Sequence, residues 1–143
     1  MESTSDRQKG GLSERHQNEI EHGRHLAESG QPEVIWNWGS PAGQVRAKRR
    51  AQLIAEAAGL APGKQALEVG CGTGLFSELM LPHGAHILAV DISPDLIDLA
   101  KGRKLPEDQV DFRAISFEYA GQPTQFDAIV GSSVLHHLEM IPA

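Results

Sequence analysis

Several residue types are scarce in this chain, and each shortage excludes a class of protein. Cys71 is the single cysteine among 143 residues, so the chain cannot form an internal disulfide, as is usual in a reducing cytoplasm. No apolar run approaches the ~18 residues that span a bilayer, and residues 1–25 lack the apolar core of a secretory signal. The net charge of −6 argues against electrostatic binding of nucleic acid. We therefore expect a cytoplasmic protein without membrane or nucleic-acid partners.

Large apolar side chains are also scarce at the start of the chain. Residues 1–32 are polar, with scattered glycine and serine, and they bury too little surface to offset the entropy lost on ordering. We expect them to form a disordered or helical tail, with the helix at Ser13–Ser29. The remaining residues, 33–143, are assigned to one globular domain.

Strand-like and helix-like segments alternate after residue 40. The predicted helices are 41–59, 74–81, 95–101 and one that starts at 134, and the predicted strands are 65–69, 85–91, 109–115 and 126–131. Ser40 and Ser93 each place a capping hydroxyl before a proline, which is typical of a helix start. In the first helix Val45, Leu53 and Ile54 recur near the helical period and should face the core. The alternation predicts an α/β fold with a parallel sheet and right-handed crossovers.

The stretch LEVGCGTGLFS, at Leu67–Ser77, places Gly70, Gly72 and Gly74 directly after the first predicted strand. Glycine weakens a strand interior, so the alternation indicates that the backbone itself has a role there. In an open α/β sheet, ligands bind outside the carboxyl ends of the strands. Glycines at that point allow a tight turn and a close approach of the ligand, and the next helix N-terminus favours a carboxylate or phosphate.

Asp91 ends the second predicted strand, 19 residues after Gly72. That distance is close to the ~20 residues expected for an acid that binds ribose hydroxyls. A carboxylate can accept two hydrogen bonds from a vicinal diol, so the residue type suits this role. The alternative is that Asp91 only precedes the helix cap at Ser93. Together with the glycine turn, the spacing favours a nucleoside ligand.

The glycine pattern does not fit a dinucleotide. The fingerprint G-x-G-x-x-G/A needs Gly or Ala at its last position, where this chain has Leu75 or Ser77, depending on the starting glycine. The pattern is instead E-x-G-x-G-x-G, and Glu68 would repel a pyrophosphate. S-adenosylmethionine carries an ammonium group, a carboxylate, a ribose and an adenine, which together suit Glu68, the helix N-terminus and Asp91. An NAD-dependent oxidoreductase remains a rival interpretation.

Three segments, ALEVGCGTG, LAVDISPDLI and FDAIVGSSVLHHL, resemble successive motifs of class I S-adenosylmethionine-dependent methyltransferases. The resemblance covers about residues 36–141. It implies a three-layer Rossmann-like fold, S-adenosyl-L-methionine as cofactor and methyl transfer to a small-molecule acceptor. The implied cofactor contacts are Glu68, Gly70, Cys71, Gly72 and Gly74 in the glycine turn, Asp91 and Ile92 after the second strand, Ser116 and Phe117 after the third, and Ser132 after the fourth.

The resemblance also suggests what each contact does. The glycine turn would surround the methionine part of the cofactor, Asp91 would hold the ribose hydroxyls, and Ile92 would pack on the adenine. Ser116 and Phe117 would lie near the adenine edge, where the family often has an acid and this chain has a serine. Ser132 would face the methionine end.

Methyl transfer from a sulfonium is an in-line displacement, for which alignment and exclusion of water can supply ~7–11 kcal/mol. His136 and His137 follow the fourth predicted strand and are the candidate catalytic bases, the alternative being that they only line the pocket. Cys71 has no identifiable base that would activate it as a nucleophile. The other clustered histidines, His16, His22 and His25, lie in the polar tail. A metal site there would need a defined fold and further ligands, so we expect none.

The chain has room for only four of the seven strands that the resembling family arranges in the order 3-2-1-4-5-7-6. We therefore expect a domain truncated after its fourth strand, which would leave an apolar sheet edge. A partner chain could complete the sheet. A non-catalytic fragment or interaction module that keeps only the cofactor-binding half is the second alternative to an active methyltransferase.

Overall fold

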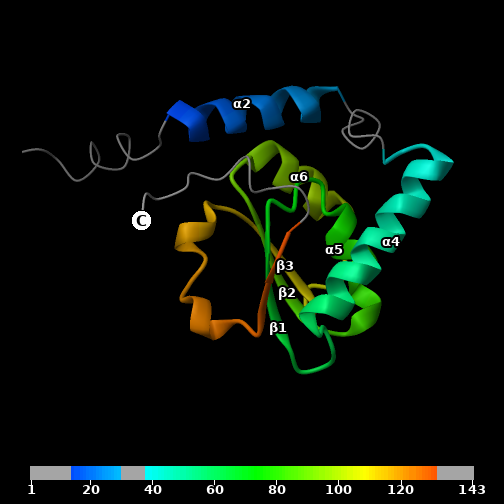
Figure 1. The fold of residues 1–143 in the computed structure, drawn as a ribbon. Helices are drawn as coiled ribbons and strands as arrows, with labels where there is room; N and C mark the ends of the chain where they lie inside the picture. Colours follow the sequence, from blue (N-terminus) through cyan, green and yellow to red (C-terminus); the bar gives the residue numbers. More distant parts are fainter. Residues whose placement is uncertain (1–13, 30–37, 132–143) are drawn as a thin grey trace, which may run out of the picture.

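The computed structural model describes residues 14–29 and 38–131. They form a parallel four-stranded sheet in the order β3-β2-β1-β4, with helices beside it (Figure 1). The strands are β1 (Gln65–Val69), β2 (His86–Asp91), β3 (Val110–Ala114) and β4 (Ala128–Val130). The α-helices are α2 (Glu14–Glu28), α4 (Pro41–Ala58), α5 (Leu75–Met80) and α6 (Pro94–Gly102), and the short 3-10 helices are η1 (Leu81–His83), η2 (Phe117–Tyr119) and η3 (Pro123–Gln125). The predicted α/β alternation is confirmed. The helix predicted from residue 134 lies outside the described residues.

Strand β1 lies at the centre of the sheet. Leu67 is opposite Leu88 of β2 on one side and Ile129 of β4 on the other. The chain passes outward from β1 to β2 and β3 and then returns to the far side of β1 with β4. The strand order therefore reverses between β1 and β4, and the carboxyl ends beside such a switch point are where open α/β sheets bind ligands.

Both faces of the sheet are covered. On one face the buried side chains of α4, α5 and α6, including Ala51, Met80 and Ile97, pack with the sheet in one cluster. On the other face a smaller cluster includes Phe117 and Ala120 from the connection between β3 and β4. Figure 1 shows the sheet between α4 and α5 on one side and the η2–η3 connection on the other. The third layer is thus formed by short 3-10 helices among the residues described.

Helix α4 begins and ends where its sequence signals predict. The Ser40 hydroxyl accepts a hydrogen bond from the Gly43 N–H at 3.0 Å, and Gly59 closes the helix with a left-handed φ of 67°. The predicted core face of α4 is only partly confirmed: Ile54 is half-buried and packs against the core, but Val45 and Leu53 are 67% and 55% exposed. The residues that face inward are small and four apart: Gly43, Ala47, Ala51 and Ala55. Small side chains let the helix lie close to its neighbours. The sequence prediction missed this face because it looked for large apolar residues.

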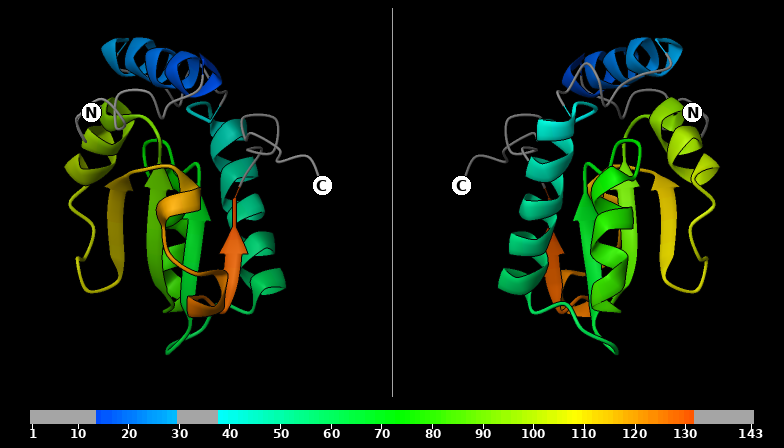
Figure 2. Two further views of the ribbon diagram at one scale, coloured as in Figure 1. Left: turned by 90° about the vertical axis from the view of Figure 1, so that its left-hand side faces the viewer. Right: turned by 90° about the vertical axis from the view of Figure 1, so that its right-hand side faces the viewer.

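Helix α2 matches the helix predicted within the polar segment. It packs against α6, and it lies beyond the ends toward which the strands point (Figure 2). Leu26 of α2 is buried, so this segment buries more surface than its composition suggested. No helix in the described parts of the chain is long and apolar enough to cross a membrane.

Candidate functional site

The glycine turn joins β1 to α5 at the carboxyl ends of the strands. The N–H groups of Gly70 and Cys71 both donate to the carbonyl of Val90, at 2.9 and 3.0 Å, which fixes the start of the turn to the end of β2. The Gly74 N–H donates to the Cys71 carbonyl at 2.9 Å. All three glycines of the turn have positive φ, between 54° and 82°. The turn is therefore closed by backbone hydrogen bonds in conformations that favour glycine; Gly70 is exposed, whereas Gly72 and Gly74 are buried.

Asp91 connects the glycine turn to the start of α6. One carboxylate oxygen accepts from the Gly72 N–H at 3.0 Å, and the other accepts from the Ser93 N–H at 2.9 Å. The residue is half-buried. Asp91 thus does take part in the cap at the start of α6, which was the alternative interpretation of this residue. It also contacts Gly72, the middle glycine of the turn. Its carboxylate stands at the carboxyl end of β2, next to the switch point.

Glu68 lies buried beneath the turn, on the helical side of the sheet. Only 3% of the residue is exposed, and the hydroxyl of Ser77 in α5 donates to its carboxylate. The pKa of Glu68 is raised from 4.5 to about 7, mainly because the carboxyl is buried; the hydrogen bond from Ser77 opposes part of the rise, and the nearby charge of Asp91 adds to it. The contact between Glu68 and Ser77 therefore joins the end of β1 to α5, on either side of the glycine turn. Ser77 carried no signal in the sequence that would have revealed this contact.

Cys71 is buried within the turn. Burial raises the pKa of its thiol well above the usual value, and the nearby carboxylates of Glu68 and Asp91 add to the rise. The thiolate, which is the nucleophilic form, is thus disfavoured. The geometry agrees with the expectation that Cys71 contributes a small buried side chain rather than a reactive thiol.

Arg103, directly after α6, was not identified from the sequence. Its Nε donates to the Thr73 carbonyl at 2.6 Å, and its Nη1 pairs with Glu78 of α5 at 2.6 Å. Arg103 thereby joins the glycine turn, α5 and α6. A lone arginine after a helix-ending glycine gives no sequence pattern from which this role could be predicted.

Replacing Arg103 with alanine is expected to lower the free energy of unfolding by about 1–2 kcal/mol, because hydrogen bonds to a charged group are lost at a largely covered site. The matched control is Arg113→Ala. Arg113 pairs with Asp111 at 2.7 Å, but both side chains are about half exposed, so the expected cost is at most a few tenths of a kcal/mol. Urea unfolding of both variants measures the difference, and equal losses would contradict the role of Arg103.

Helix α4 is connected to the first turn of α5 by aromatic contacts. The Trp38 ring meets the Phe76 ring edge-on, with centroids 5.4 Å apart. The guanidinium of Arg50 lies 5.1 Å from the centroid of a Trp38 ring. The sequence contains a basic cluster at Arg46, Lys48, Arg49 and Arg50, and all four are exposed. Of these four residues, Arg50 is the one that lies over Trp38, so it contacts the Trp38–Phe76 pair at the start of α5.

The remaining predicted contacts lie at the ends of β2 and β3. Ile92 is half-buried after Asp91, and Phe117 packs in the cluster on the sheet face opposite the helices. The hydroxyl of Ser116 donates to the carboxylate of Glu118. The resembling family often has an acid near position 116, and in this chain an acid lies two residues later, at Glu118. Ser132, His136 and His137 lie outside the described residues.

This chain matches a methyltransferase family model and curated methyltransferases. A family model described as a methyltransferase domain matches residues 67–143. The ubiquinone biosynthesis O-methyltransferase of Xanthomonas campestris pv. campestris (strain B100) is 38% identical over 107 residues, which are 72% of this chain and 45% of that protein. The protein of the same name from Xylella fastidiosa (strain 9a5c) is 43% identical over 79 residues, 53% of this chain and 32% of its own length. The chain thus spans less than half the length of these curated relatives.

Solved structures share the fold. N-methyltransferase NodS from Bradyrhizobium japonicum WM9, in complex with S-adenosyl-L-homocysteine, matches with a TM-score of 0.68 and 23% identity, over 86% of this chain and 60% of that chain. Magnesium protoporphyrin IX methyltransferase (ChlM) from Synechocystis PCC 6803 matches with a TM-score of 0.66 and 18% identity, over 87% and 61% of the two chains. At these identities the likeness is one of fold.

Proposed function

This chain belongs to the methyltransferase-domain family of class I S-adenosylmethionine-dependent enzymes, and from that premise we propose that it binds S-adenosyl-L-methionine at the glycine turn and transfers its methyl group to a small-molecule hydroxyl. The observation that carries the proposal is the contact of Asp91 with the Gly72 N–H beside the switch point. The choice of an oxygen acceptor follows the names of the curated O-methyltransferase relatives.

The residues of the site fit such a cofactor. The carboxylate of Asp91 stands half-buried at the carboxyl end of β2, and in the proposal it accepts hydrogen bonds from the ribose hydroxyls. The half-buried Ile92 packs on the adenine, with Ser116 and Phe117 near its edge. Glu68 and the glycine turn, with Gly70, Cys71, Gly72 and Gly74, surround the methionine part, mostly through backbone and water; Gly70 is the exposed glycine of the turn. Residues 33–143 would form the cofactor-binding domain.

The cofactor supplies a sulfonium-bound methyl group, and the chain would contribute alignment, exclusion of water and removal of a proton. Displacement at a sulfonium needs no fixed set of catalytic side chains. A hydroxyl acceptor needs a base, and His136 or His137 is proposed for that role. Ser132, after β4, is proposed to face the methionine end of the cofactor.

The proposal includes further polypeptide along β4, from a partner chain or from more of the same protein. Strand β4 is the last strand on its side of the described sheet, and its Ile129 is exposed. This apolar side chain would be covered in a wider sheet. Support comes from the length of the curated relatives, of which this chain spans 45% or less in the two alignments given above.

Calorimetric titration with S-adenosylhomocysteine and with NADH tests the proposed function. We expect binding of S-adenosylhomocysteine and no binding of NADH. Asp91→Asn should weaken that binding about tenfold or more, because an ionised acceptor is replaced by a neutral one. The control is Asp111→Asn, which changes a half-exposed carboxylate on β3, where its partner is Arg113. Binding of NADH alone would favour the oxidoreductase, and binding of neither ligand would favour a non-catalytic module.

A further inference from the structure

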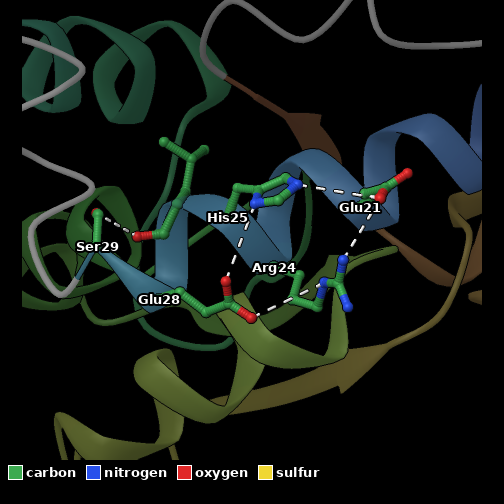
Figure 3. Close-up of polar contacts among 6 residues, drawn as sticks. Glu21, Arg24, His25, Glu28 and Ser29 are labelled. Atoms are coloured by element: carbon green, nitrogen blue, oxygen red, sulfur yellow. Dashed lines mark hydrogen bonds and ion pairs between the residues drawn. The ribbon is translucent and has the colours of Figure 1, made fainter.

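Helix α2 presents two different faces. On its outer face Arg24 lies between Glu21 and Glu28, with its nitrogens 3.4 and 4.0 Å from their oxygens, and His25 lies near the same two carboxylates (Figure 3). The opposite face carries Gly23 and Leu26, which are buried. The helix is thus amphipathic, and its buried face packs on α6.

The contact between α2 and α6 depends on a glycine. A Cβ atom at Gly23 would lie 2.3 Å from the Ser93 Oγ, 2.5 Å from the Ser93 Cβ and 3.3 Å from the Leu96 Cδ1. The first two distances are shorter than any ordinary non-bonded contact, so only glycine allows the two helices to meet here. A glycine in the middle of a helix weakens it relative to alanine, and close packing on Ser93 is a physical reason for its presence.

Ser93 also holds the proposed ribose-binding carboxylate. Its backbone N–H donates to Asp91 at 2.9 Å, and its hydroxyl accepts from the Leu96 N–H at 3.3 Å as the cap of α6. The other oxygen of Asp91 accepts from the Gly72 N–H. A continuous series of contacts therefore runs from α2 through Ser93 and Asp91 to the glycine turn.

We propose that Gly23 and Ser93 are positioning residues, through which docking of α2 holds Asp91 in its cofactor-binding place. The inference rests on the proposed cofactor function and extends it to residues 14–28, which lie outside the family match at 67–143. When α2 leaves α6, Ser93 and Leu96 lose their cover and the cap that orients Asp91 loosens. Because coupling between two sites is reciprocal, the bound cofactor must in turn hold α2 on α6.

The first test is Gly23→Val in the full chain, with Asn18→Val as a matched control. Asn18 is on the same helix but exposed, so the control places the same β-branched residue where nothing is displaced. We expect Gly23→Val to weaken binding of S-adenosylhomocysteine by about tenfold, within the usual range of coupling between sites, and Asn18→Val to bind as the native chain does. Hydrogen exchange of α2 reports docking directly, and S-adenosylhomocysteine should slow it in the native chain.

A compensating pair separates this role from a general loss of stability. Gly23→Ala favours the helix but still clashes with Ser93, so it should weaken binding. Adding Ser93→Gly removes both clashing atoms and keeps the backbone N–H that holds Asp91. Gly23→Ala should therefore weaken binding of S-adenosylhomocysteine less in the Ser93→Gly background than in the native chain. This pair also serves if Gly23→Val does not fold.

The inference is overturned if Gly23→Val binds S-adenosylhomocysteine with native affinity while hydrogen exchange shows α2 released from α6. It is also overturned if the ligand leaves exchange of α2 unchanged in the native chain. Failure of the native chain to bind S-adenosylhomocysteine is a different result, because it rejects the proposed function itself.

Discussion

Replacing Glu68 with glutamine is expected to remove a pH-dependent loss of stability worth about 3 kcal/mol. The carboxyl is buried, and its pKa rises from 4.5 in the unfolded chain to about 7 in the folded one. Between these values the folded chain binds this proton more strongly than the unfolded chain, so the free energy of unfolding falls as the pH rises, and the loss is complete above pH 7. Glutamine is nearly isosteric and has no such proton, so its profile lacks this fall.

Urea unfolding at several pH values from 4.5 to about 8 measures the effect. The difference in unfolding free energy between Glu68→Gln and the native chain should shift by about 3 kcal/mol in favour of the variant across that range. Glu107→Gln is the control, since it removes an exposed carboxyl and leaves the buried one in place. Parallel profiles for Glu68→Gln and the native chain would show that Glu68 is not held as a neutral acid. Cys71 does not interfere, because burial raises the pKa of its thiol above this range.

The sheet could be predicted from the sequence because its signals are local. The strand predicted at residues 65–69 is β1 with the same bounds. Ser40 and Ser93 cap the starts of α4 and α6, and Gly59 ends α4, as expected. Strand β4 is shorter than predicted, at Ala128–Val130. In α4 the pattern of large residues was only partly informative, since Ile54 packs against the core while alanines form most of the buried face and Val45 is exposed.

The contacts that support the glycine turn could not be predicted, because they join residues far apart in the sequence. Asp91 was found from its spacing to Gly72, which is a property of the whole motif. Ser77, by contrast, was not recognised as the partner of Glu68, and Arg103 was not recognised as the partner of Thr73. No periodicity or cap specifies such pairs. They follow from the way α5 and α6 pack on the sheet, which only the folded chain shows.

Replacing Gly74 with alanine is expected to destabilise the fold by about 2–5 kcal/mol, through two separate costs. The residue has φ of 82°, a left-handed conformation that an L side chain adopts at a cost of about 1–2 kcal/mol. In addition, a Cβ there would lie 2.9 Å from the Phe112 ring and 3.3 Å from the Ala100 Cβ. Phe112 is buried in the core, so its ring cannot move aside freely, and overpacking adds about 1–3 kcal/mol.

Gly59→Ala separates the two costs. Gly59 is also left-handed, with φ of 67°, but a Cβ there would meet nothing within 4 Å. This variant should lose only the conformational part, about 1–2 kcal/mol, and should bind S-adenosylhomocysteine as the native chain does. The larger loss for Gly74→Ala, with weaker ligand binding, would show that close packing of α6 and β3 against the turn maintains the site. Equal losses in urea unfolding would mean that only the backbone conformation matters at position 74, and that a side chain fits there without disturbing the turn.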